Sequence, residues 1–370
     1  MIQEVEPQDV PDIVVELEPV GIPTFLLGSP GIGKSDVIVE CARRVSALKN
    51  GGDPMDLIIN PTSDYKQKPG EYALRMFNAT YLEPEDFVFP SIDLVNKKYE
   101  RLVIDHLPRD PFSLMSFEEI AKKPDLFKIL AQLMNEGRLG LDYVLPKATY
   151  MMGTSNLVTD RAGAHDIHND LINRCEILIV KPTAEGFCRH HDGELSPEIM
   201  GLLKWFPDLI MTFDSGKRSK PFASPRSIFK FNKILLNNPA IDRHKSIDQI
   251  MLGLVGEKFT VEFQTMARAF RNLGDIDAMI DDPDSHRDEI NRLKNDTSHN
   301  GKQTLCSVII MLAKRVKKDP SQYNNIVSFM ERLDEECAVT FTHIALQVNS
   351  KVRNEPEFGR HYARNQGFYF

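Results

Sequence analysis

Cysteine is scarce in this chain of 370 residues. The five cysteines are Cys41, Cys175, Cys188, Cys306 and Cys337, and no two form a C-x-x-C pair. An odd, dispersed set argues against a disulfide framework and indicates reduced thiols in a cytoplasmic compartment. Cys188, His190 and His191 lie close together in the sequence, but four ligands at zinc spacing are not present, so no zinc site is predicted.

Long apolar runs and excess positive charge are also missing. No apolar run approaches the roughly 18 residues of a membrane helix, and MIQEVEPQDV at the start has no features of a secretion signal. We therefore expect a soluble protein that neither spans a membrane nor is exported. The net charge of −8 provides no general field for nucleic acid. The basic clusters at 217–220 and 314–318 lack interleaved aromatic residues, which disfavours nucleic-acid binding.

Short apolar segments alternate with helical patterns in the first half of the chain. This alternation predicts an α/β fold with a parallel sheet. A helix is predicted over 126–136 because its periodicity ends at Gly137, and a hairpin follows over 138–145. Residues 61–100 fit no single regular element, and such a long stretch is typical of a functional segment. The predicted strands are Pro23–Leu27, Leu57–Asn60, Arg101–Asp105, Thr149–Thr154 and Glu176–Val180.

Helical patterns replace strands after residue 185. We expect an α/β core over 1–182, a helical lid over 183–275 and a helical C-terminal extension over 276–370. The polar stretches 281–289 and 294–301 are predicted to be exposed linkers.

A glycine-rich motif, Gly28-Ser-Pro-Gly-Ile-Gly-Lys-Ser35, matches G-x-x-x-x-G-K-[ST] at every fixed position. It follows a predicted strand and precedes a predicted helix, as a phosphate-binding loop must. Glycines let backbone N–H groups turn inward at the helix N-terminus, Lys34 adds a positive charge, and the Ser35 hydroxyl can bind Mg²⁺. The motif predicts binding of ATP or ADP with Mg²⁺. The predicted nucleotide-binding residues are Gly28, Ser29, Pro30, Gly31, Ile32, Gly33, Lys34, Ser35 and Asp36.

A second carboxylate, at the end of a neighbouring strand, is needed to hold Mg²⁺ in such a site. Asp105 ends the apolar run LVID and is predicted to fill this role, together with Ser35.

Several separated segments resemble the MoxR branch of the AAA+ ATPases, over roughly residues 20–265. TSNLVTDRAGAHD (154–166) is similar to the family's sensor-1 segment, which implies that Asn156 lies near the γ-phosphate. LINRCEIL (171–178) resembles an element whose arginine, here Arg174, reaches into the neighbouring subunit's site. FASPRSIFKF (222–231) resembles the sensor-2 motif in the lid, which implies that Arg226 is the sensor-2 arginine. GLVGEKFTVEF (253–263) is similar to the following lid segment.

One position departs from the family pattern. Relatives have Asp-Glu at the end of the third strand, where the glutamate activates the attacking water, whereas this chain has Asp105-His106. A neutral histidine, with a pKa near 6.5, can accept a proton but presents a different geometry. Asp110, Glu118 and Glu119 are alternative bases in the following segment. We expect a Mg²⁺-dependent ATPase whose rate His106 can lower.

The resemblance implies a homo-oligomeric ring, usually a hexamer, with nucleotide between subunits. It also implies a motor or chaperone that remodels proteins, with 61–100 and 138–145 as the acting surfaces. A von Willebrand factor A-type partner is inferred from kinship, and the client is not identified. Two alternatives stay open: a nucleotide-gated scaffold with weak hydrolysis, and a DNA-directed motor, against which the acidic composition counts.

Overall fold

The computed structural model describes residues 4–62, 64–103, 107–139, 143–160, 163–167, 169–216, 220–238, 246–272 and 276–365. The chain divides into two compact units. The sheet unit comprises Met1–Pro182 with Asp214–Arg218, and the helical unit comprises Thr183–Phe213 with Ser219–Phe370. Among the helices of the described ranges, none combines the length and the apolar character needed to cross a lipid bilayer.

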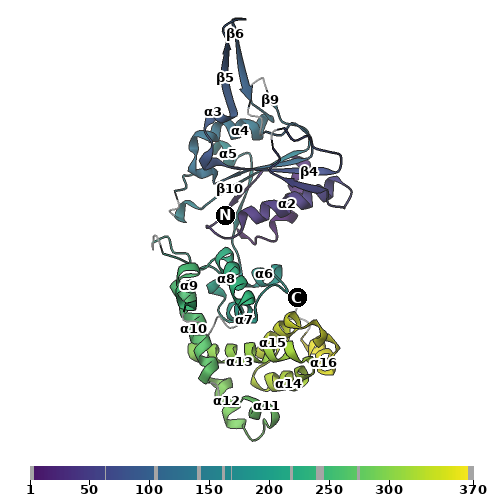
Figure 1. Cartoon of the computed structure of the whole chain (residues 1–370), viewed down its shortest axis with the longest axis vertical. Coiled ribbons are helices and arrows are strands. Elements are labelled where there is room, and N and C mark those ends of the chain that lie inside the picture. The colour runs from purple at the N-terminus through teal and green to yellow at the C-terminus, as the bar shows by residue number, and fades with distance from the viewer. Residues whose placement is uncertain are drawn as a thin grey trace. The chain divides into compact units, whose positions relative to one another are not determined.

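A parallel sheet of seven strands forms the centre of the sheet unit (Figure 1). Its strand order is β1-β11-β2-β10-β7-β4-β3, and every neighbouring pair is parallel. The predicted α/β fold is therefore confirmed. The strands are β1 (Glu4–Val5), β2 (Thr24–Leu27), β3 (Asp56–Ile59), β4 (Glu71–Asn78), β7 (Ser113–Glu118), β10 (Thr149–Ser155) and β11 (Glu176–Val180).

The described part of the predicted strand Arg101–Asp105, residues 101–103, is not part of this sheet. Residues up to 103 belong to β6 (Lys98–Val103), which pairs antiparallel with β5 (Val88–Asp93) in a hairpin that projects from the unit (Figure 1). The place between β10 and β4 is filled by β7 instead. Interior parallel strands are covered on both faces and need nearly continuous apolar sequence. The first five residues of SLMSFE (113–118) are uncharged and buried, whereas KYERLV (98–103) carries three charged residues.

Helices cover both faces of the sheet. Phe25, Phe117 and Met151 lie on the face packed against α4, and Leu26 and Leu114, on the opposite face, are equally buried. The α2 helix packs against α1 and against β3, β4 and β7. The helices of this unit are α1 (Val10–Leu17), α2 (Lys34–Lys49), α3 (Pro84–Phe87), α4 (Phe127–Glu136) and α5 (Asn169–Ile172).

The end of α4 and the hairpin after it agree with the sequence prediction. Gly137 caps α4 in the left-handed conformation, with φ +61°. The chain then forms β8 (Arg138–Leu139) and β9 (Tyr143–Val144), which pair antiparallel. In contrast, β4, β5 and the start of β6 lie within 61–100, for which the sequence predicts no regular element.

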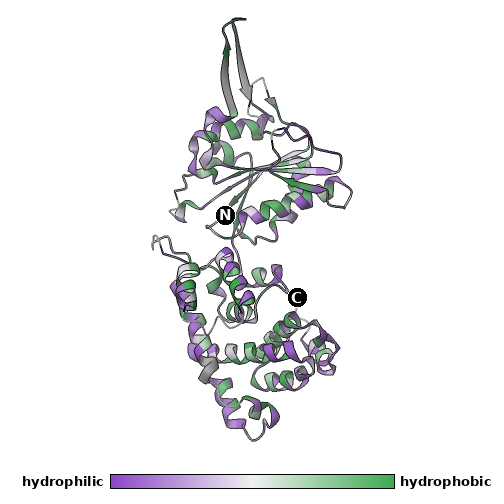
Figure 2. Ribbon diagram, viewed as in Figure 1, coloured by the Kyte–Doolittle hydropathy of each residue, from purple (hydrophilic) through white to green (hydrophobic). Residues whose placement is uncertain are grey.

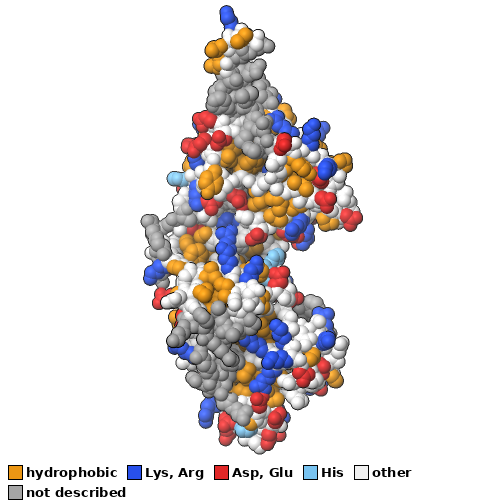
Figure 3. Space-filling model, in the orientation of Figure 1, with side chains coloured by type: hydrophobic (Ala, Val, Ile, Leu, Met, Phe, Trp, Pro, Cys, Tyr) orange, Lys and Arg blue, Asp and Glu red, His pale blue; other side chains and the backbone are white. Residues whose placement is uncertain are grey.

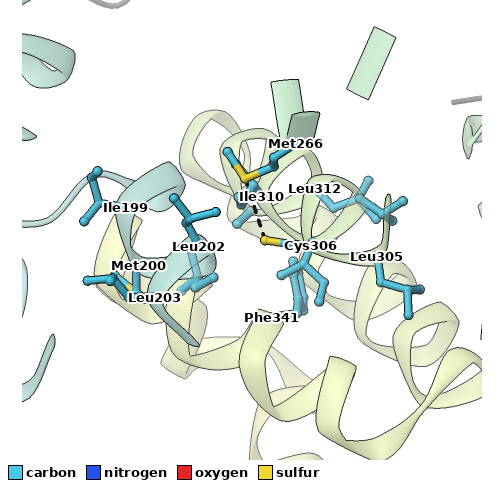
Figure 4. Packing of buried hydrophobic residues seen from close by; sticks show 14 of the residues in the cluster. Ile199, Met200, Leu202, Leu203, Met266, Leu305, Cys306, Ile310, Leu312 and Phe341 are labelled. Atoms are coloured by element: carbon cyan, nitrogen blue, oxygen red, sulfur yellow. Dashed lines mark hydrogen bonds between the residues drawn. The ribbon is translucent and has the colours of Figure 1, made fainter. Parts of the chain in front are cut away.

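The helical unit has no strand among its described residues. One hydrophobic core runs from Ala184 to Val352, so the predicted lid and extension share a single core. In Figure 2 the apolar faces of these helices turn toward one another, and in Figure 4 Cys306 of α13 lies among side chains of α7, α10 and α15. The helices are α6 (Ala184–His190), α7 (Pro197–Trp205), α8 (Pro225–Asn237), α9 (Ile247–Leu254), α10 (Gly256–Asn272), α11 (Ile276–Asp281), α12 (Arg287–Asn295), α13 (His299–Lys318), α14 (Tyr323–Leu333), α15 (Glu335–Val348) and α16 (Pro356–Arg364).

The two segments predicted to be linkers are partly helical. The α12 helix begins at Arg287, within the first segment, and ends at Asn295, within the second. The α13 helix begins at His299, also within the second segment, and is capped by the Ser298 side chain. Both helices contribute apolar residues to the shared core, including Ile290 and Leu305. The polar sequence of these stretches reflects their exposed faces rather than a lack of structure.

Candidate nucleotide-binding site

The glycine-rich loop lies at the carboxyl end of β2, between β10 and β11. After β2 the chain crosses to the far edge at β3, and it later returns to both sides of β2. Ligands of open parallel sheets bind at such a switch point, outside the carboxyl ends of the strands. The sequence motif and the sheet topology thus indicate the same position.

Glycine is required at several positions of this loop. Gly31 and Gly33 have φ of +84° and +96°, a region that side-chain-bearing residues rarely adopt. A Cβ on Gly28 would lie 2.6 Å from the Val180 carbonyl oxygen and would also strike Ile32. The loop therefore packs closely on the end of β11 and leads directly into the 16-residue helix α2. Its amides lie at the positive end of that helix, which suits an anion.

Lys34 and Asn156 meet above the loop. The Lys34 ammonium donates to the carbonyl oxygens of Gly28 (2.5 Å) and Ser29 (3.1 Å) and to Oδ1 of Asn156 (3.0 Å). Asn156 directly follows β10, the strand beside β2, and is only 8% exposed. A polar side chain from a second strand thus reaches the position where this lysine contacts the β- and γ-phosphates in P-loop proteins.

Ser35 is joined to the end of β7. Its hydroxyl donates to Oε1 of Glu118, the last residue of that strand. Because β10 lies between β2 and β7, this bond spans the carboxyl end of β10, where Asn156 lies. Four side chains, from two strand ends and the first turn of α2, therefore converge: Lys34, Ser35, Glu118 and Asn156.

Glu119 follows at once and has an unusual backbone. Its φ of +58° places it in the left-handed region, which is uncommon for residues with long side chains and clusters at functional sites. Its carboxylate forms an ion pair with Lys122, and both side chains are about one-third exposed. Sequence reasoning had named Glu118 and Glu119 only as substitutes for His106. The signal in the sequence is a pair of acidic residues directly after SLMSF, a run without charged residues.

An acidic side chain also touches the loop from the segment after Asn156. The Ser29 hydroxyl donates to Oδ1 of Asp160 (3.2 Å). Oδ2 of Asp160 is buried and has no hydrogen-bond partner among the residues that the structure describes. Burial raises the pKa of Asp160, against the lowering effect of Ser29, of the Leu157 backbone and of Lys34. Nothing in the local sequence announces this contact, which joins residues 131 positions apart.

Other predicted nucleotide-binding residues differ in what they present. The Ile32 side chain is buried, so only its backbone faces a ligand, and Asp36 is exposed in the first turn of α2. Asp105 and His106 lie outside the described residues. The prediction for both residues depended on their following a strand of the parallel sheet. The strand that precedes them is β6, which belongs to the β5–β6 hairpin instead.

The two predicted arginines are not beside this loop within the sheet unit. Arg174 lies between α5 and β11, and β11 starts level with Thr24, the first residue of β2. It is therefore at the amino edge of the sheet, separated from the loop by the length of β2, roughly 13 Å. Arg226 belongs to the helical unit, where it is the second residue of α8 and is exposed.

The residues present suit a magnesium ion. Mg²⁺ prefers oxygen ligands and is usually held by one or two carboxylates, waters and substrate phosphates. Ser35 and Glu118 supply such oxygens at the phosphate end of the loop. Within the described residues, no group of three or more His, Cys, Asp and Glu side chains is placed to hold a metal without the nucleotide.

No protein-family model and no curated protein sequence matches the chain. Among solved structures, a "putative ATPase" from Cytophaga hutchinsonii is 12% identical, with 84% of this chain and 76% of that chain covered, at a TM-score of 0.32. NtrX from Brucella abortus is 8% identical (99% and 69% covered, TM-score 0.34), and its complex with ATP is 11% identical (94% and 69%, 0.31). Because these TM-scores lie below 0.5, the interpretation of the site depends on the chain's own residues.

Proposed function

We propose that this protein is a Mg²⁺-dependent ATPase of the AAA+ type that binds ATP at Gly28–Ser35. The observation that carries the proposal is the convergence of Lys34, Ser35, Glu118 and Asn156 at the switch point of a parallel sheet. A phosphate loop alone predicts binding. A carboxylate joined to its serine, with a second carboxylate beside it, supports hydrolysis.

Each residue has a defined task in this proposal. The loop amides and Lys34 neutralise the phosphate oxygens, and Ser35 with Glu118 would hold Mg²⁺, which stabilises the charge of the transferring phosphoryl group. Asn156 orients the terminal phosphate or the attacking water. Glu119 accepts the proton of that water as the bond from the terminal phosphorus to ADP breaks. To do so it must leave Lys122.

The scaffold alternative loses its basis with this assignment. It depended on His106 replacing the catalytic glutamate, and the β7 end offers Glu118 and Glu119 instead. No observation on the described residues favours a DNA-directed motor.

We further propose that the protein acts as a homo-oligomeric ring, as in the MoxR branch, on a protein client. The β5–β6 hairpin supports this proposal because its free end exposes hydrophobic side chains (Figure 3). Ile92, Leu94 and Val95 are 67%, 83% and 90% exposed. Clustered exposed apolar residues mark surfaces that bind other proteins. A von Willebrand factor A-type partner belongs to the same proposal.

The proposed nucleotide site is tested by Lys34→Ala. We expect the affinity for ATP to fall by roughly 10–100-fold, because a charge-assisted contact of about 1.5–3 kcal/mol is lost. Isothermal titration with ATP and Mg²⁺ measures the change, and circular dichroism checks the fold. Lys128→Ala removes the same charge from an exposed position on α4 and should bind as the wild type does. Equal affinity of Lys34→Ala and wild type would refute the site.

The proposed client surface is tested by the double substitution Leu94→Asp/Val95→Asp. Basal ATP turnover should stay within about twofold of the wild type, because the hairpin lies outside the parallel sheet. Binding of a permanently unfolded probe, reduced carboxymethylated lactalbumin, should be lost in fluorescence anisotropy. Val20→Asp alters an apolar residue of similar exposure, 68%, away from the hairpin and serves as the control. Unchanged probe binding by the double variant would exclude the hairpin as the acting surface.

A further inference from the structure

The carboxylate of Asp160 contacts the phosphate-binding loop, where a negative charge opposes the binding of phosphate. It is the last residue of the short helical turn Val158–Asp160, four positions after Asn156. Its Oδ1 accepts from the hydroxyl of Ser29 in the phosphate loop, while the Ser29 carbonyl accepts from Lys34. One loop residue therefore links Asp160 to the lysine that neutralises phosphate.

The unpaired oxygen makes this contact costly. Oδ2 of Asp160 is buried, and no described residue forms a hydrogen bond with it. An ionised carboxylate can only accept hydrogen bonds, and a buried acceptor without a donor is unfavourable. A purely structural role for this turn would be served by asparagine, which keeps the bond from Ser29 and carries no charge. Burial raises the pKa of the Asp160 carboxyl, because the ionised form loses its hydration.

The position of Lys34 indicates which phosphate Asp160 would oppose. In phosphate loops this lysine reaches the β- and γ-phosphates. Here its ammonium contacts both Ser29 and Asn156, and Asp160 contacts the same Ser29. A phosphate and a carboxylate both need donors and repel one another at short range. The γ-phosphate, which extends beyond the amide nest, meets this repulsion more strongly than the β-phosphate within it.

We propose that Asp160 determines the nucleotide preference of the site, lowering affinity for a nucleoside triphosphate relative to the diphosphate through its contact with Ser29. The inference depends on the proposed function, since it concerns the same site. Triphosphate binding must draw Ser29 away from Asp160 or protonate the carboxylate. Asp160 thereby makes the loaded state less stable and favours the ADP-bound or empty site.

The test compares AMP-PNP, a non-hydrolysable triphosphate, with ADP. Full-length Asp160→Asn is titrated with each nucleotide in the presence of Mg²⁺ at pH 8. The preference for AMP-PNP over ADP should rise on the order of tenfold, as expected when one like charge is removed. Asp166→Asn removes the same charge from an exposed position in the following segment and should leave the ratio unchanged. Circular dichroism confirms that both variants are folded.

A double-mutant cycle tests the route through Ser29. Once Ser29→Ala has removed the hydroxyl, Asp160→Asn should change the ratio much less, because contacting residues are not additive. An unchanged or lowered ratio in Asp160→Asn overturns the inference, as does full additivity with Ser29→Ala. If Lys34→Ala loses both nucleotides while Asp160→Asn leaves the ratio unchanged, the nucleotide site stands and this inference alone fails. If the wild type binds neither nucleotide, both fail.

Discussion

Glu119→Gln should lower the rate of ATP hydrolysis by about 10²–10⁴-fold, the usual contribution of a general base. Glutamine keeps the size and the hydrogen-bonding shape of the side chain but cannot accept the proton of the attacking water. The affinity for ATP should stay near that of the wild type, because Lys34, Ser35 and Glu118 remain in place. Steady-state phosphate release gives the rate, and titration with AMP-PNP gives the affinity.

Two further variants test whether His106 or Glu118, rather than Glu119, is the general base. His106→Gln should hydrolyse ATP at close to the wild-type rate, since the base is assigned to the end of β7. Glu118→Gln should raise the Mg²⁺ concentration needed for half-maximal turnover, because its carboxylate is assigned to the metal. A large loss of rate in His106→Gln, with Glu119→Gln unaffected, would return the base to His106 and reject the assignment to Glu119.

Local sequence was sufficient for the phosphate loop and for the strands beside it. The loop needs glycines at Gly31 and Gly33, and each of β2, β10 and β11 is a short apolar run with clear ends. These features depend on neighbours in sequence. The end of α4 at Gly137 belongs to the same class, because a left-handed cap is set by one residue.

The second carboxylate could not be found in this way. RLVID (101–105) and SLMSFEE (113–119) both look like strands that end in an acid. Which of the two joins the parallel sheet depends on its pairing partners, and these lie far away in sequence. Residues 101–103 of the first segment pair with β5 in a hairpin. The charged residues of that strand suit a position outside the buried sheet. The Ser29–Asp160 contact was missed for the same reason, because it exists only once two distant loops are folded.

The same limit applies to the helical unit. The helical character of residues 183–370 was evident from the sequence, whereas the boundary between lid and extension was placed at 275 on family resemblance. The shared core crosses that position, with Met266 of α10 packed against Cys306 of α13 (Figure 4). Packing between helices is non-local, and helical periodicity alone does not define which helices share a core.

Arg174→Ala should reduce ATP hydrolysis by roughly 10³–10⁵-fold, the range for an arginine that stabilises the phosphoryl-transfer transition state from another chain. ATP affinity should change little. Arg174 precedes β11 at the amino edge of the sheet, whereas the phosphate loop is at the carboxyl edge. The length of the strands between them exceeds the reach of an arginine side chain. In the proposed ring, a direct effect of Arg174 on hydrolysis would therefore act on the site of a neighbouring subunit.

Mixing two inactive variants tests this geometry. Arg174→Ala chains keep an intact phosphate loop, and Lys34→Ala chains keep the arginine, so a site between the two in the correct order has both parts. In a randomly mixed head-to-tail ring, about a quarter of the interfaces are complete. Mixing equal amounts should therefore restore a substantial fraction of wild-type phosphate release, while each variant alone stays inactive. Arg43→Ala, which removes an exposed arginine on α2, should be active without mixing. If size-exclusion chromatography with differently tagged chains proves that mixed rings form, yet no activity returns, Arg174 does not act between subunits.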